Sequence, residues 1–305
     1  MNGSPEPRDA PPAPPRVLYV MGAGRSGSTI LGVALGNCEK VFFAGELDRW
    51  FARSGVPRDG EQRRRFWEAV GERVGDAQDV FTADTTLLER SSTAFKIGTW
   101  ARQRRMRARY REVSENLYLA IAAATGASHI VDSSHYPRRA RQLQQLARVE
   151  LHLLFLTRDP RSIVASLARR DVPERRFGEL AANSYLWLTY LFSLLVFLRH
   201  PRRRRLFVRH EDFLADPEAV LREILRRSGA STSIPDLGSL RPGVPFHGNR
   251  LIKQETIALA AGVRAPSGAA PLTRALQLPW ALVFAHLHPS VSSSPFTMPQ
   301  DNRHK

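Results

Sequence analysis

The sequence predicts an α/β protein built on a doubly wound parallel sheet that is flanked by helices. Short, unbroken apolar runs, which are typical of strands buried on both faces, alternate along the chain with segments of helical pattern. Strands and helices that alternate in this way form parallel sheets with right-handed crossovers. The 305 residues are 43% hydrophobic and 24% charged, which is enough apolar material for a substantial core.

These patterns define the elements in chain order. The predicted strands cover residues 17–21, 41–44, 129–131, 151–157 and 205–208. The predicted helices between and after them cover residues 28–36, 137–148, 159–170 and 216–229. The last two helices both begin with an Asp-Pro pair, in which the aspartate caps the helix and the proline takes its first position.

The remaining segments outline the domain organisation. Residues 1–15 hold six prolines and no apolar run, so we expect a disordered tail and not a signal peptide. Residues 16–253 form the predicted α/β domain. Within it, residues 53–110 are helical, arginine-rich and without a strand, which indicates an insertion over one face of the sheet, a common place for substrate recognition. Residues 254–305 are expected to be a partly ordered C-terminal extension.

Two features bear on the cellular compartment. The single cysteine, Cys38, excludes an intrachain disulfide and is typical of a reducing compartment, which favours the cytoplasm. Residues 180–198 carry no charge and reach transmembrane length, but polar residues interrupt them and they lie between two predicted sheet elements. We therefore expect a buried helix against the sheet and no membrane-spanning segment, while peripheral association with a membrane stays open.

The charge of the chain favours an anionic ligand. The formal net charge is +16, and 41 of the 45 basic residues are arginines, whose planar guanidinium groups bind phosphate and sulfate in bidentate fashion. Nucleic-acid binding is not expected, because the basic run RHPRRRR at 199–205 has no aromatic residues between its arginines. The histidines show no metal-ligand spacing, and no metal is expected.

The strongest motif is GAGRSGST at 22–29, between a predicted strand and a helix, where backbone N–H groups and the helix dipole hold an anion. It partly matches a P-loop, but Ser28 stands where the phosphate-binding lysine belongs, which weakens the interpretation as a nucleotide kinase. It also matches the GxGxxG fingerprint of dinucleotide-binding oxidoreductases, with Glu46 placed to bind a ribose. In a third interpretation, Arg25 places a guanidinium against the bound anion. The motif alone leaves all three open.

A second motif, LTRDPRSIVASLARR at 156–170, decides between them. It again follows a predicted strand, so that Arg158 leaves the strand at its C-terminal end and Ser166 lies on the next helix. Two anion sites on one sheet suit a nucleotide with phosphate groups at both ends. The interpretation as a dinucleotide-binding oxidoreductase leaves the second anion site, at Arg158 and Ser166, unexplained.

With these two motifs the chain resembles the family of sulfotransferases that use 3'-phosphoadenylyl 5'-phosphosulfate (PAPS), and it looks more like the bacterial and tyrosylprotein-type members than the cytosolic enzymes. The resemblance covers residues 16 to about 253 and implies the P-loop-like sulfotransferase fold, with PAPS as donor and 3',5'-ADP as product. By the same resemblance the first motif binds the 5'-phosphosulfate, and Arg158 and Ser166 bind the 3'-phosphate. The matching residues of the first motif are Gly24, Arg25, Ser26, Gly27, Ser28 and Thr29.

Three weaker matches extend the resemblance. Residues 209–225 look like the family's strand and Glu-Asp turn, with His210 where tyrosine is more usual. FHGNR at 246–250 is similar to a Gly-Asn-Arg segment that closes over the nucleotide, which implicates Asn249 and Arg250. VDSSHYPRR at 131–139 looks like an Asp-Ser-Ser segment, with His135 where lysine is more often expected.

Sulfuryl transfer needs charge neutralisation on the sulfate, in-line placement of an acceptor and removal of the acceptor's proton. Arg25 and the loop N–H groups would supply the first. For the base we prefer Glu46, just beyond the second predicted strand, since tyrosylprotein-type members place their base in a similar Gly-Glu segment; His135 is the second candidate. The acceptor, a hydroxyl or an amine, stays open among small metabolites, glycans, lipid head groups and peptides.

Overall fold

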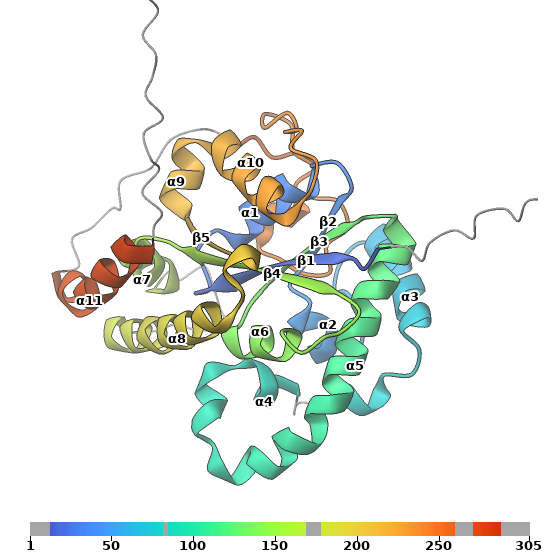
Figure 1. Cartoon of the computed structure of the whole chain (residues 1–305), viewed down its shortest axis with the longest axis horizontal. Coiled ribbons are helices and arrows are strands. Elements are labelled where there is room, and N and C mark those ends of the chain that lie inside the picture. The colour runs from blue at the N-terminus through green and yellow to red at the C-terminus, as the bar shows by residue number, and fades with distance from the viewer. Residues whose placement is uncertain (1–12, 82–84, 169–177, 260–270, 288–305) are drawn as a thin grey trace, which may run out of the picture.

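A five-stranded parallel sheet forms the centre of the protein (Figure 1). The computed structural model describes residues 13–81, 85–168, 178–259 and 271–287. Its strand order is β2-β3-β1-β4-β5, so the predicted doubly wound α/β fold is confirmed. The strands are β1 (Arg16–Gly22), β2 (Val41–Gly45), β3 (His129–His135), β4 (Glu150–Thr157) and β5 (Arg205–Arg209).

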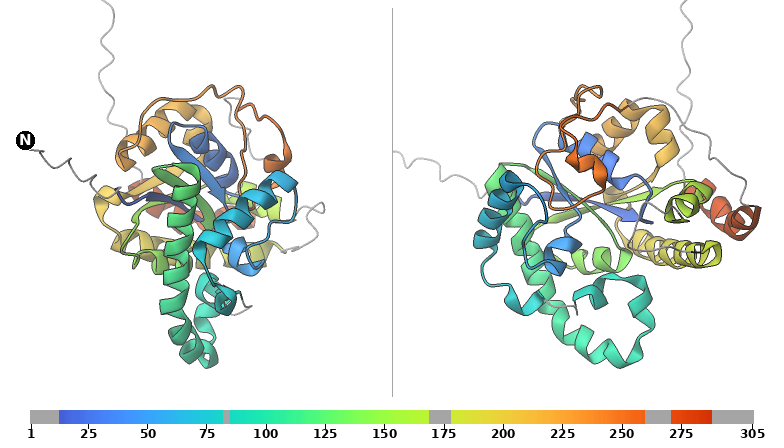
Figure 2. Two further views of the ribbon diagram at one scale, coloured as in Figure 1. Left: turned by 90° about the vertical axis from the view of Figure 1, so that its right-hand side faces the viewer. Right: turned by 180° about the vertical axis from the view of Figure 1, so that it is seen from behind.

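Helices cover both faces of the sheet (Figure 2). One face carries α1 (Ser28–Gly36), α9 (His210–Ala215) and α10 (Pro217–Ser228). The other face and its margins carry α2 (Asp48–Ala52), α3 (Glu61–Val74), α4 (Thr85–Glu89), α5 (Trp100–Thr125), α6 (Pro137–Leu143), α7 (Pro160–Ala168), α8 (Glu179–Arg199) and α11 (Pro271–Leu287). Short 3-10 helices are η1 (Gln78–Val80), η2 (Ser91–Phe95), η3 (Ile97–Thr99), η4 (Arg202–Arg204) and η5 (Arg250–Lys253).

The central strand β1 shows why its sequence is apolar without interruption. Val17, Tyr19 and Met21 belong to the core under α5 and α8, whereas Leu18 and Val20 belong to the core under α1 and α10. Side chains alternate between the two faces of a strand, and both faces are covered here. Every residue of β1 after Arg16 is therefore buried.

Most predicted elements lie within one or two residues of their observed bounds, and two differ. The helix predicted over 137–148 ends at Leu143, because the backbone N–H groups of Ala147 and Arg148 donate to the Glu115 carboxylate on α5 and turn the chain into β4. The third strand continues to His135 instead of ending at 131, and its polar residues are buried. The last two residues of the helix predicted over 159–170 lie outside the described residues, as do residues 1–12 of the predicted tail.

The uncharged stretch forms α8, which packs on β1 and β4 as expected and also contacts α6, α7 and α11. Among the described residues, α8 is the one helix that by length and composition could cross a membrane. Its buried side chains include Ala182, Leu186 and Tyr190, whereas its outer side is exposed. Trp280 of α11 is buried against it, with its ring centroid 5.7 Å from that of Tyr190.

A buried ionic network lies between α5, α6 and β3. Arg139, which has no exposed surface, donates through Nη2 to Asp132 Oδ2 (3.2 Å) and through Nη1 to the Tyr110 hydroxyl. The Tyr118 hydroxyl also donates to Asp132 Oδ2 (2.6 Å), and Tyr110 donates to Glu89 (2.6 Å). A buried cation of this kind stabilises only if its charge partners remain in place.

Replacing Arg139 tests this network. Arg139→Met should lower the free energy of unfolding by about 3–5 kcal/mol, because two carboxylates lose their buried cation. Arg222→Met on α10, where an exposed arginine pairs with Glu218, should cost at most about 0.5 kcal/mol. Urea denaturation of both variants measures the difference, and equal costs would show that the buried network contributes no more than a surface ion pair.

Candidate functional site

The glycine-rich loop connects β1 to α1 at the carboxyl edge of the sheet. Ser26 and Thr29 are buried, whereas Arg25 is exposed and has a positive φ of 70°, which is uncommon for a residue other than glycine. The helix begins at Ser28 with no side-chain cap and no acidic residue in its first turn. Its N-terminal N–H groups are therefore free of a capping side chain and suited to an anion.

Gly27 and Gly24 fix the position of this loop. A Cβ at Gly27, whose φ is 95°, would lie 2.4 Å from the His210 ring, so only glycine fits there. Gly24 donates its N–H to the Tyr185 hydroxyl on α8 (2.8 Å). The loop is thus held between α9 on one side and α8 on the other.

The second predicted anion-binding segment lies directly beside the first. β4 pairs with β1 so that Leu156 is opposite Gly22, and Arg158 Nη1 donates to the carbonyl oxygen of Arg25 (3.2 Å). Asp159 begins α7 as predicted, since its carboxylate accepts from the N–H of Arg161 (2.8 Å). Ser166 lies in the second turn of α7 and is half-buried.

His210 joins the two segments from the opposite side of the loop. Burial and the nearby charge of Arg158 lower the pKa of His210 to about 4. Within the part of the chain that the structure describes, its buried Nδ1 atom has no hydrogen-bond partner. The ring therefore presents a neutral, unsatisfied nitrogen at the base of the loop.

The segment 246–250, which by resemblance would close over a nucleotide, lies beside the start of α1. The backbone N–H of Glu46 donates to the carbonyl of His247 (2.9 Å), and a Cβ at Gly248 would lie 3.4 Å from Thr29. The side chain of Asn249 caps η5 by accepting from the N–H of Leu251 (2.8 Å). Arg250 is exposed at the rim.

Glu46 follows β2 at the same edge, but it is already engaged. His247 Nδ1 donates to Glu46 Oε2 (3.0 Å). Burial would raise the pKa of Glu46, but this hydrogen bond and the charges of nearby side chains lower it to about 2. Glu46 is therefore ionised at neutral pH and is a weaker base than an ordinary carboxylate.

His135 ends β3 in a conformation that its neighbours impose. Its φ is 56°, and the preceding Ser134 donates its N–H to Asp132 Oδ1 (2.9 Å) in the buried network. On the other side, the Tyr19 hydroxyl donates to the carbonyl of Tyr136 (2.9 Å). The Asp-Ser-Ser segment therefore has a structural role: it holds the turn at His135. Burial lowers the pKa of His135, so the imidazole is neutral at neutral pH.

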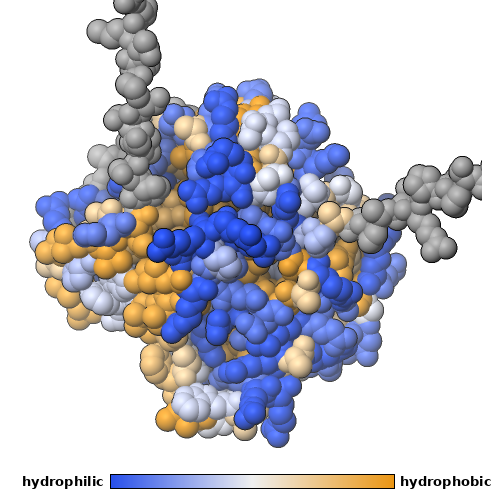
Figure 3. All heavy atoms as spheres, viewed as in Figure 1, coloured by the Kyte–Doolittle hydropathy of each residue, from blue (hydrophilic) through white to orange (hydrophobic). Residues whose placement is uncertain are grey.

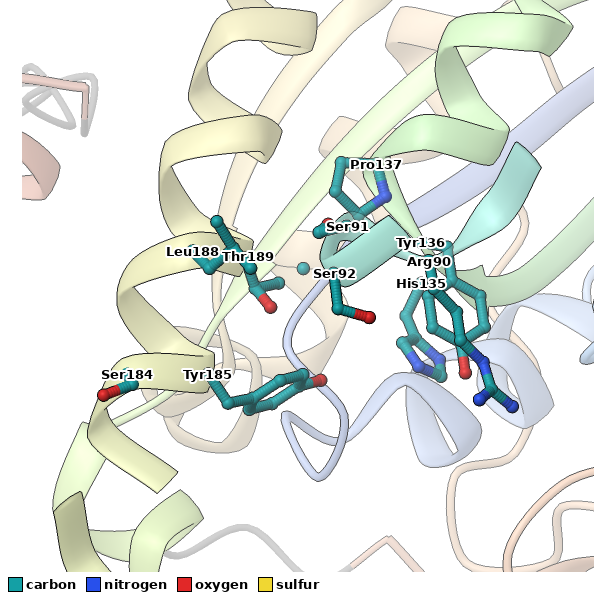
Figure 4. A pocket seen from close by; sticks show the side chains of 11 residues that line it. Arg90, Ser91, Ser92, His135, Tyr136, Pro137, Ser184, Tyr185, Leu188 and Thr189 are labelled. Carbon is teal, nitrogen blue, oxygen red and sulfur yellow. The ribbon is translucent and has the colours of Figure 1, made fainter. Parts of the chain in front are cut away.

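A cavity of about 550 Å³ opens beside His135 (Figure 4). Its walls come from α8, from the end of β3 and from η2, and Figure 4 shows Tyr185 and His135 on opposite sides of it. The lining residues are Gly22, Arg90, Ser91, Ser92, His135, Tyr136, Pro137, Ser184, Tyr185, Leu188 and Thr189. Glu46 does not line it. A second cavity of about 360 Å³ lies beside Arg158 and includes Arg209, Glu211 and Trp280.

Sequence reasoning missed Tyr185, Tyr136 and His247. Tyr185 lies inside the uncharged stretch, where an aromatic residue at helical spacing indicates only core packing. His247 lies 201 residues from its partner Glu46, and no local pattern connects them. Among residues 13–81, 85–168, 178–259 and 271–287, no group of three or more histidine, cysteine or acidic side chains could hold a metal ion.

Comparisons with known proteins bear on the family and on the fold. The family model described as "Sulfotransferase family" matches residues 16–233. The sulfotransferase domain from the curacin biosynthetic pathway has a similar structure (TM-score 0.52, 17% identity, 88% of this chain and 99% of that one). So does the sulfotransferase domain from the Synechococcus PCC 7002 olefin synthase (TM-score 0.52, 18% identity, 92% and 98%). A comparison with curated proteins found no match.

The buried state of His210 predicts a pH-dependent stability. Its pKa is about 4 in the folded protein against 6.5 for an exposed histidine, so the unfolded chain binds the proton more tightly. Stability should therefore fall as the pH drops from 6.5 towards 4, by up to about 3 kcal/mol from this group. His210→Phe should lose less stability than the wild type between about pH 7 and about pH 4.5 in urea denaturation. An unchanged pH dependence in the variant would contradict the neutral, buried state of His210.

Proposed function

Because the chain belongs to the sulfotransferase family, we propose that it transfers the sulfuryl group of PAPS to a hydroxyl or amine acceptor. The observation that carries the proposal is the contact between Arg158 and the carbonyl of Arg25, which unites two cationic segments at one edge of the sheet. A donor with anionic groups at both ends of a nucleotide suits such a pair. We expect this reaction in the cytoplasm.

The residues present fit the donor. The N-terminal N–H groups of α1 and the Arg25 guanidinium would hold the 5'-phosphosulfate, with Ser26, Ser28 and Thr29 in the same loop. Arg158 and Ser166 would hold the 3'-phosphate. The buried, unpartnered Nδ1 of His210 supports this, since it lies between the two segments and lacks a hydrogen bond among the described residues. Asn249 and Arg250 would close the site from above.

Bound there, the donor supplies an activated sulfuryl group. The contribution of the chain is positional and electrostatic: Arg25 and the loop neutralise charge on the sulfate and its bridging oxygen. Because Gly24 donates to Tyr185 on the wall of the larger cavity, the loop and the cavity share a boundary. An acceptor in this cavity would face the loop and therefore the sulfuryl group of a donor held there.

The geometry favours His135 over Glu46 as the group that takes the acceptor's proton. His135 lines the cavity and is neutral at neutral pH. Its Nε2 atom is close to the glycine-rich loop, since it would lie 3.9 Å from a Cβ added at Gly24. The carboxylate of Glu46, with a pKa of about 2, lies outside the cavity. Its negative charge favours the protonated imidazole of His135 that proton transfer creates. Glu46 would therefore assist and His135 would accept.

The other candidate functions fit less well. A nucleotide kinase would need a lysine at Ser28, and the oxidoreductase interpretation would need Glu46 free to bind a ribose, whereas Glu46 is hydrogen-bonded to His247.

Discrimination between nucleotides tests the donor site. By calorimetry, the wild type should bind 3',5'-ADP about 10²-fold more tightly than 5'-AMP, because a charge-assisted contact is lost with the 3'-phosphate. Arg158→Met should reduce this preference below about tenfold. Arg226→Met, on the exposed side of α10, serves as the control and should keep it. Equal affinity of the wild type for the two nucleotides would refute a donor site that binds phosphate groups at both ends of the nucleotide.

Two variants test the base in transfer assays with radiolabelled PAPS and an acceptor found by screening a panel. His135→Gln should lower turnover by about 10²- to 10⁴-fold, and Glu46→Gln by about 10- to 10²-fold, because only the first loses the proton acceptor. Both should bind 3',5'-ADP within about threefold of the wild type, since neither touches the donor. The reverse order of the two effects would assign the base to Glu46.

A further inference from the structure

Three large apolar side chains are exposed at the tip of the segment that joins α4 to α5. Phe95, Ile97 and Trp100 have exposed fractions of 67%, 71% and 55%. This segment protrudes at the bottom of the view in Figure 1 and is held in shape locally, since the Trp100 indole donates to the carbonyl of Ala94 (3.1 Å). Exposed aromatic residues that are fixed on a protrusion point to a binding surface.

The outer side of α8 continues this apolar surface. Its exposed hydrophobic residues follow one another at helical spacing, and Ser184 is the polar exception between them. They are Leu180, Trp187, Leu191, Leu195 and Leu198. The Phe95 ring at the tip contacts the Phe192 ring of α8 at 6.3 Å between centroids, so the two parts adjoin. Figure 3 shows hydrophobic residues gathered over α8 and the neighbouring α11. We call the tip and this stripe together the apolar face.

The larger cavity lies inside the apolar face. Ser184 belongs both to the exposed side of α8 and to the cavity wall, and Ser92, also exposed, lines the cavity from η2 at the base of the tip. The cavity is thus bordered by the tip on one side and by the stripe on the other. A partner that covers the apolar face would also cover the mouth of the cavity.

The charge next to the apolar face identifies the kind of partner. From Arg90 to Arg111 the sequence holds seven arginines and one lysine and no acidic residue. Five of these cations flank the tip and are exposed: Lys96, Arg102, Arg104, Arg105 and Arg107. Aromatic and aliphatic side chains beside clustered cations are the combination that binds an anionic bilayer surface.

We propose that the apolar face docks on an anionic lipid bilayer, with Phe95, Ile97 and Trp100 inserted among the acyl chains and the flanking cations at the headgroups. α8 then lies along the bilayer surface with its inner side still on the sheet, and does not cross the bilayer. One further step rests on the proposed function: if that function holds, the cavity receives a hydroxylated amphiphile directly from the bilayer.

Two other partners are less consistent with the same surface. A second copy of the chain would bring two clusters of +8 into contact across a symmetric interface, since residues 90–111 of both copies would lie beside it. A nucleic acid would use the cations but not the apolar stripe of α8. No basic residue lies between Trp187 and Leu191 in that stripe to bind a phosphate. Both are outcomes that the test distinguishes.

Sedimentation with vesicles, without nucleotide or acceptor, tests the proposal separately from the reaction. The wild type should bind phosphatidylglycerol-containing vesicles at least about tenfold more tightly than pure phosphatidylcholine vesicles. The combined variant Phe95→Ser, Ile97→Ser and Trp100→Ser should reduce binding to the anionic vesicles by at least about tenfold. Val56→Ser, at an exposed apolar residue outside the apolar face, is the control and should bind as the wild type does.

A matched pair of charge variants isolates the electrostatic part. Arg104→Gln, Arg105→Gln and Arg107→Gln together should weaken binding to anionic vesicles by at least about tenfold. The same three substitutions at Arg222, Arg226 and Arg227 on α10 remove equal charge from the opposite side of the sheet and should have less than about a threefold effect. Equal weakening by both sets would mean that net charge acts without a defined face, which overturns the proposal.

Fluorescence quenching keeps the proposal testable if the combined tip variant does not fold. Brominated lipids should quench tryptophan emission in the wild type, and Trp100→Phe and Trp187→Phe should each lose part of that quenching while still binding. Three results would overturn the proposal: no binding to anionic vesicles, a dimer in light scattering that the tip substitutions dissociate, or tighter binding to an RNA fragment than to vesicles. Calorimetry with 3',5'-ADP on the same variants shows whether the donor site is intact and so reports on the proposed function independently.

Discussion

The parallel pairing of β1 with β3 and β4 is the constraint on which the site depends. Because the three strands run in the same direction, their carboxyl ends meet at one edge, and the loop after β1 lies between the segment that leaves β3 and the segment that leaves β4. The register places Leu156 opposite Gly22, so Arg158 reaches the carbonyl of Arg25. On the other side, Met21 is opposite His135. One strand thus aligns the two segments that we propose to hold the donor with the histidine that we propose as proton acceptor.

The buried network around Arg139 has a related effect on the cavity. Asp132 accepts hydrogen bonds from Ser134, Tyr118 and Arg139, and these contacts fix the turn that gives His135 its positive φ. Backbone strain of this kind persists only where the surroundings determine it fully. The conformation of His135 therefore depends on an ionic cluster that is itself buried.

The sequence predicted the sheet, the positions of the two candidate anion-binding segments and α8 because each has a local signature. Apolar runs without alternation mark β1 and β4, and an Asp-Pro pair marks the start of α7 and of α10. The cavity could not be predicted in this way, since Tyr185 and Ser92 carry no pattern that separates them from core or loop residues. The engagement of Glu46 by His247 likewise depends on tertiary contact, and it changes how well Glu46 can act as a base.

The contact between Glu46 and His247 also has a consequence for how the protein folds. The two residues are 201 positions apart, and the segment around His247 is the part of the site that a ribosome releases late. Contacts of such sequence separation are slow to form, because the closure of a long loop must precede them. A nascent chain can complete its sheet and the loops after β1 and β4 while the segment that lies beside the start of α1 is still missing. The contact between Glu46 and His247 should therefore form after the sheet and after the two segments that we propose to hold the donor.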